Sequence, residues 1–94
     1  MARKALDRQP LLTEGLVHKV VRLEQDGGDE MEILLIETGK PRQGTHGYWI
    51  ERHMRFRGVD AAPSREKYDK LDAARESMAS RIRLFIGSGW RTIA

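Results

Sequence analysis

The sequence predicts an α+β fold: a small antiparallel sheet of three strands, or four if residues 64–68 also form one, packed against one C-terminal helix. Two observations predict it. Before Asp69, apolar residues alternate with polar ones at the spacing of strands, and after Asp69 they recur at the three- and four-residue intervals of a helix. Glycine-rich segments separate the strand-like stretches, as turns and loops do.

The first predicted strand spans residues 16–24, where Val17, Val20 and Val21 favour extended backbone. Simple alternation places Val17 and Val21 on one face and Val20 on the other. Residues 26–29, with the sequence Asp-Gly-Gly-Asp, follow and supply glycines for the positive φ angles of a tight hairpin turn. The next strand is therefore expected to pair with the first in antiparallel fashion.

The second predicted strand, residues 31–38, is apolar on both faces in its middle. Leu34 and Ile36 share one face, and the odd-numbered apolar residues share the other. A half-exposed antiparallel strand alternates more cleanly, so we expect a central strand. Its second face is covered either by Leu11 and Leu12 of the N-terminal segment or by a second copy of the chain in a symmetric homodimer.

Residues 48–57 form the third predicted strand and show the cleanest alternation in the chain. Its even-numbered residues include Ile50 and Phe56 and are expected to face the helix. Its odd-numbered residues are expected to face solvent, and they are Trp49, Glu51, His53, Arg55 and Arg57. The preceding residues, 39–47, hold glycines, a proline and basic side chains, which predicts a basic loop.

The C-terminal helix is expected to start at Asp69, which would cap it together with Asp72 in a variant of the capping box. Gly87 is placed to adopt the left-handed conformation that ends a helix, and Trp90 would then pack back on the last turn. The apolar stripe of this helix consists of Leu71, Ala74, Met78, Ile82, Phe85 and Ile86.

Length and composition indicate one domain. We expect residues 1–14 to form a flexible N-terminal arm and residues 15–94 a single β-β-β-α domain. The absence of cysteine excludes a disulfide framework, a thiolate zinc site and a cysteine nucleophile. No apolar run approaches the roughly 20 residues of a membrane-spanning helix, so we expect no membrane partner and a cytoplasmic location.

Charge is distributed unevenly along the chain, whose net charge is +3. Residues 15–39 carry a net −4, whereas residues 40–94 carry a net +6. Such asymmetry can steer a polyanion towards one face of a small protein. A solvated surface of mixed charge is the simpler explanation of the same numbers.

The solvent face expected for the third strand is the sharpest functional candidate. Arginine forks suit phosphate oxygens and guanine edges, and an indole can stack on a base. We therefore predict a non-enzymatic nucleic-acid-binding module, DNA or RNA, whose binding residues are Lys40, Arg42, Trp49, His53, Arg55 and Arg57. The competing interpretation is that Arg55 and Arg57 form cross-strand pairs with Glu24, Glu32 or Glu37.

The alternative function is a protein-interaction or homodimerising module that works through the apolar part of the sheet. We expect no cofactor, no small-molecule ligand and no metal, because His18, His46 and His53 show no tight ligand spacing. We also expect no catalysis. Ser88 lies between two glycines but lacks the strand–turn–helix setting of a nucleophile elbow.

The order of strands followed by a helix is similar to that of the DNA-binding N-terminal domains of some phage-type integrases. The closing Gly89-Trp90 pair also resembles the end of WGR domains, although the Trp-Gly-Arg run that defines them is absent. Similar architecture does not define function, and we assign the chain to no family on these grounds.

Overall fold

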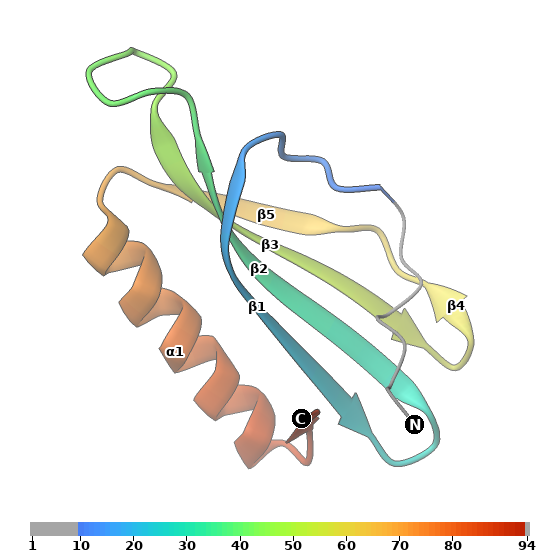
Figure 1. Ribbon diagram of the computed structural model, residues 1–94. Helices are drawn as coiled ribbons and strands as arrows, with labels where there is room; N and C mark the ends of the chain where they lie inside the picture. The colour runs from blue at the N-terminus through green and yellow to red at the C-terminus, as the bar shows by residue number, and fades with distance from the viewer. Residues whose placement is uncertain (1–9, 94) are drawn as a thin grey trace.

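The computed structural model describes residues 10–93, which form an antiparallel sheet and one helix (Figure 1). The α+β class is confirmed. The sheet has six strands, however, so the predicted number of three or four is too small. The elements are β1 (Leu16–Gln25), β2 (Asp29–Thr38), β3 (Gly47–Phe56), β4 (Val59–Asp60), β5 (Ser64–Tyr68), α1 (Leu71–Gly87) and β6 (Arg91–Thr92).

The sheet has the order β4-β3-β2-β1-β6, and β5 also pairs with β3. β4 lies beside the end of β3 at Arg55 and Phe56, whereas β5 lies beside its first part, from Tyr48 to Arg52. The two therefore share one edge of β3. β4 and β6 were not predicted, because strands of two residues are too short to show any alternation.

The helix covers one face of the sheet, and residues 10–15 run along the other (Figure 1). The core lies between α1 and the odd-numbered residues of β2, with Ile50 and Met54 of β3. The fully or nearly fully buried members of this core are Leu23, Met31, Ile33, Leu35, Ile50, Ala74, Met78 and Trp90. The prediction that β2 is central is confirmed, since it pairs with β1 on one side and β3 on the other.

A β-bulge at His18 changes the face assignment at the start of β1. Val17 pairs with Ile36 and Lys19 with Leu35, so one extra residue lies between them. Val17 therefore shares the face of Val20, away from the helix, and the predicted grouping of Val17 with Val21 is wrong.

The helix ends differ from the prediction. The N-cap is Lys70, without a side-chain capping hydrogen bond, so the capping box expected from Asp69 is not formed. At the other end Gly89, with φ 101°, is the left-handed residue, not Gly87. The Trp90 amide donates to the Phe85 carbonyl at 3.0 Å, as in a Schellman motif. Trp90 packs edge-on against Phe85, which confirms its predicted return onto the last turn.

The middle of the face of the sheet away from α1 is also buried. Leu34 and Ile36 are at most 1 % exposed there. The described part of the predicted N-terminal arm, residues 10–14, lies on this side, with the Leu12 amide and the Thr13 hydroxyl bound to Glu51. Residues 1–9 of that arm lie outside the described residues.

Candidate nucleic-acid interface

The six residues predicted to bind nucleic acid fall into separate places. Lys40 and Arg42 lie in the loop between β2 and β3, and Trp49 lies near the start of β3. Arg55 lies near the opposite end of β3, six residues further along, which is about 20 Å from Trp49 for an extended strand. The structure therefore does not bring the predicted residues together in one compact patch.

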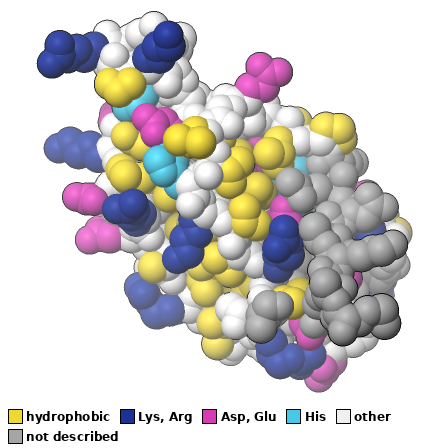
Figure 2. Space-filling view, viewed as in Figure 1, with side chains coloured by type: hydrophobic (Ala, Val, Ile, Leu, Met, Phe, Trp, Pro, Cys, Tyr) yellow, Lys and Arg dark blue, Asp and Glu magenta, His cyan; other side chains and the backbone are white. Residues whose placement is uncertain are grey.

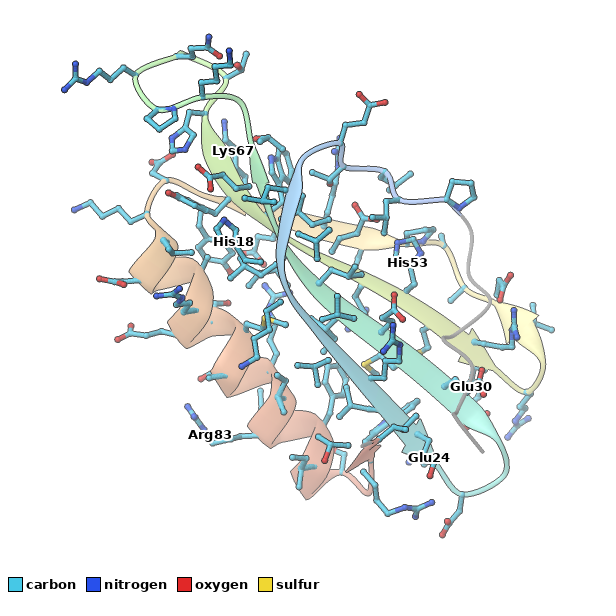
Figure 3. All side chains as sticks on the ribbon, in the orientation of Figure 1. His18, Glu24, Glu30, His53, Lys67 and Arg83 are labelled. Atoms are coloured by element: carbon cyan, nitrogen blue, oxygen red, sulfur yellow. The ribbon has the colours of Figure 1, made fainter. Side chains whose placement is uncertain are left out.

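The middle of this face is not open to solvent, contrary to the sequence-based expectation. Glu51 is fully buried and His53 is 3 % exposed. Glu51 accepts hydrogen bonds from the Thr13 hydroxyl at 2.7 Å and the Leu12 amide at 2.9 Å, and its Oε2 lies 2.5 Å from His53 Nε2. Figure 3 shows His53 on the side of the sheet away from α1. The alternation correctly placed Glu51 and His53 on the face away from the helix. It did not indicate that the N-terminal segment covers them.

Burial alone would raise the pKa of Glu51, but its hydrogen bonds act in the other direction. The Thr13 hydroxyl, His53 and the Leu12 amide together hold the pKa of this carboxyl below its usual value. Glu51 is thus a buried carboxylate whose charge is stabilised by donors from the N-terminal segment and from its own strand. This is the pattern of a structural clamp, which fixes the segment on the sheet.

At the C-terminal end of β3, Arg55 and Arg57 contact other side chains of the protein. Arg55 Nε donates to Asp60 of β4 at 2.9 Å, and its guanidinium also lies 3.9 Å from Glu30. Arg57 lies in the turn after β3, with φ 53°, so its predicted place within the third strand is wrong. Its guanidinium lies 5.5 Å from the centre of the Phe56 ring.

Trp49 is surrounded by cations from β5, which sequence reasoning missed. Arg65 lies 4.4 Å from the centre of the indole ring and Lys67 lies 6.0 Å from it. The indole N–H donates to the Thr38 hydroxyl at 3.2 Å. Trp49 therefore holds Arg65 by a cation–π contact and is itself fixed in orientation. Arg65 and Lys67 are two residues apart, so on a strand they lie on the same face. This spacing would have predicted their contact with Trp49 if the pairing of β5 with β3 had been known.

Arg65 and Lys67 lie over the ring of Trp49, and two more cations lie in the loop that leads into its strand. We call this surface the basic end; its members are Lys40, Arg42, Trp49, Arg65 and Lys67. Figure 2 shows Lys and Arg side chains on the loop between β2 and β3, and Figure 3 shows Lys67 at the base of this loop. Among residues 10–93, none of the four cations forms an ion pair. Their charge is therefore available to an external anion.

Two histidines meet a carboxylate on the helix side of the sheet. His18 Nε2 and His46 Nε2 each lie 2.7 Å from a different oxygen of Glu37. These hydrogen bonds lower the pKa of Glu37, and the one from His46 has the larger effect. His53 lies on the opposite face, so the three histidines do not converge. Within the described part of the chain, no three His, Asp or Glu side chains are arranged to hold a metal ion.

Comparison of the chain with models of known protein families, with curated proteins and with solved structures finds no match. No helix in residues 10–93 is long and apolar enough to span a membrane.

Proposed function

We propose that the protein is a small, non-enzymatic, cytoplasmic nucleic-acid-binding module that works through the basic end. The observation that carries the proposal is that none of the four cations of the basic end forms an ion pair among the described residues, and that two of them, Arg65 and Lys67, lie over the ring of Trp49. Cations that are paired inside a protein lose part of their attraction for phosphate, whereas these four keep it. The net charge of +3 acts in the same direction.

The four cations have different roles in this proposal. Lys40 and Arg42 extend from an exposed loop and reach the phosphates of a strand that passes the end of the sheet. Arg65 is held on the indole of Trp49, which fixes the direction of its donor fork before a phosphate arrives. Trp49 is therefore a support for Arg65, and it stacks on a base only if Arg65 moves away from its ring.

The salt dependence of binding tests this proposal. Labelled single-stranded and duplex oligonucleotides are titrated with the protein at 50 and 200 mM salt, with fluorescence anisotropy as the readout. If all four cations contact phosphates, the log–log slope is about −2.8 for single strands and about −3.6 for duplexes, so affinity falls about 50- to 150-fold between the two salt concentrations. Absence of binding at 50 mM salt would contradict the proposal.

Matched variants locate the contact. Lys40→Gln with Arg42→Gln should roughly halve the slope and weaken binding at least tenfold. Arg83→Gln with Arg91→Gln removes the same charge far from the basic end and should change affinity less than threefold. Arg55→Ala with Arg57→Ala tests the wider surface predicted from the sequence. A loss as large as that of the loop variant would extend the interface along the whole of β3.

Protein interaction is the second candidate function, and a specific observation favours it. In the part of the chain that the structure describes, β6 pairs only with Leu23 and Glu24, so the first part of β1 forms an open edge of the sheet. Open edges of sheets are templates for an added strand, whether from a partner or from a second copy of the chain. This edge lies on the opposite side of the sheet from β5, with β3 and β2 between them.

A further inference from the structure

The open part of β1 extends from Leu16 to Val21. Within residues 10–93, β2 pairs with this segment on one side and no strand pairs with it on the other. Its residues up to Val20 are exposed, and Leu16 is the most exposed of its apolar side chains at 64 %. The edge is therefore accessible to an added strand along its length.

The final residues of the chain show how this edge accepts a strand. The Ile93 amide donates to the Arg22 carbonyl at 2.8 Å, beside the antiparallel pairing of β6 with β1. Backbone groups of residues two apart in a strand point to the same side. The backbone of Arg22 points towards the residues of β6, and Val20 lies two residues before Arg22. The N–H and C=O of Val20 therefore point out of the open edge.

A groove runs beside this edge on the helix side. It has a volume of about 270 Å³ and is lined by Lys19 of β1 and by Arg75, Met78 and Ala79 of α1. Neither Lys19 nor Arg75 forms an ion pair among the described residues. Figure 2 looks onto β1 and α1 and shows hydrophobic side chains between basic ones there. The groove therefore has an apolar floor between two cations.

The opposite side of the same edge is apolar. The bulge at His18 places Val17 together with Val20 on the face away from α1. Both are more than one third exposed, at 38 % and 37 %. A strand added here would thus meet positive charge on the helix side and two valines on the other side.

We propose that the open edge of β1 binds an extended acidic segment of a partner protein as an added antiparallel strand. Side chains alternate along a strand, so the segment has acidic residues at every second position, towards Lys19 and Arg75. Apolar residues lie between them and contact Val17 and Val20. Main-chain hydrogen bonds to β1 supply affinity, and the alternation supplies specificity.

A second copy of the chain fits this edge less well. Antiparallel pairing of β1 with its own copy brings Lys19 and Arg75 of both chains to the same side of the new sheet. Like charges in such positions are destabilising, and an inward-pointing lysine on an edge strand is a known device against self-pairing. An acidic strand removes this repulsion, which is why we favour it over a homodimer.

Synthetic peptides test the proposal on the unaltered protein. A nine-residue peptide of alternating Val and Glu should bind, as measured by anisotropy of a labelled copy. A peptide of the same composition with its Val and Glu residues in two blocks should bind at least tenfold more weakly, and an alternating Val and Lys peptide should not bind. Equal binding of the alternating Glu peptide and the peptide with two blocks would show that only the total charge of the peptide matters, and it would overturn the proposal.

Backbone methylation then separates strand addition from side-chain contact. The peptide residue opposite Val20 exchanges both backbone hydrogen bonds with it, and its side chain lies on the same face of the sheet as Val20. That residue is a valine in the proposed register, so the valines of the peptide point their N–H groups towards β1. N-methylation of these valines should abolish binding, whereas N-methylation of the glutamates should leave it within threefold. The reverse pattern, or no effect of either, would contradict strand addition.

Charge reversal completes the test. Lys19→Glu should lose at least tenfold in affinity for the Glu peptide and gain binding of the Lys peptide, whereas the control Lys70→Glu should behave like the unaltered protein. Light scattering of the unaltered protein should give a monomer mass. A dimer, together with no binding of the alternating Glu peptide, would overturn the proposal.

Discussion

Glu51 is the residue whose removal should affect the fold most specifically. It is fully buried and is held by the Thr13 hydroxyl, the Leu12 amide and His53. Glu51→Ala leaves these partners buried or partly buried without their acceptor. Hydrogen bonds to a charged group are worth about 1.5–3 kcal/mol each, so the loss of those to Glu51 should destabilise the fold by at least about 3 kcal/mol, a large share of the roughly 5–15 kcal/mol of a small domain.

Urea unfolding, followed by the fluorescence of Trp49 and Trp90, measures this loss. With a slope of about 1 kcal/mol per M, the midpoint should fall by about 3 M or more. Thr13→Val is the milder form of the same change, because it removes one hydrogen bond to a charged group, worth about 1.5–3 kcal/mol. Glu66→Ala removes an exposed ion pair with Arg81 as the control and should cost no more than about 1 kcal/mol.

Equal urea midpoints for Glu51→Ala and Glu66→Ala would show that Glu51 does not clamp the N-terminal segment to the sheet. Unchanged stability of Thr13→Val would show the same, because the N-terminal segment would then not depend on Glu51. A variant that fails to fold is consistent with the upper end of the estimate, and Thr13→Val then provides the quantitative test.

Two further predictions concern stability. The folded-state pKa values of Glu37 and Glu51 are lowered from 4.5, so the stability that they contribute is complete above about pH 4.5 and is lost as the pH falls through the lowered values. Urea midpoints from pH 7 to pH 3 should therefore decrease below pH 4.5, and Glu51→Gln should flatten this decrease; a midpoint independent of pH would contradict the assignment. Gly89→Ala should cost about 1–2 kcal/mol, because Gly89 has φ 101°, and thermal unfolding should show no such loss for the control Gly87→Ala, which lies within the helix.

The sequence predicted the elements whose patterns are long. β2 is apolar on both sides, and this correctly indicated a central strand. The ten-residue alternation of β3 correctly separated Ile50 from Trp49, because the period of a strand depends only on backbone geometry.

What covers each face could not be predicted, since alternation shows only which side chains share a face. Glu51 and His53 are polar, so they suggested solvent, whereas the structure buries them with Thr13. The bulge at His18 could not be predicted either, because one inserted residue leaves no mark in a short valine-rich strand.

The candidate site required long-range pairing, which the sequence does not contain in readable form. Arg65 and Lys67 meet Trp49 only because β5 returns along the edge of β3. His18 and His46 meet Glu37 for a similar reason, since β1 and the loop before β3 both lie beside the end of β2. Residues far apart in sequence are brought together by register, and register is fixed by the whole sheet.

The central proposal is that nucleic acid binds at the basic end, and backbone amide shifts measured by NMR during titration with an oligonucleotide test it most directly. Large shifts should appear at residues 39–49 and 64–68, at low salt, and should disappear at high salt. The amides of residues 55–60 and of the helix should change little. Shifts confined to the helix or to residues 55–60, or no shifts at a protein concentration of 100 μM or less, would contradict the account.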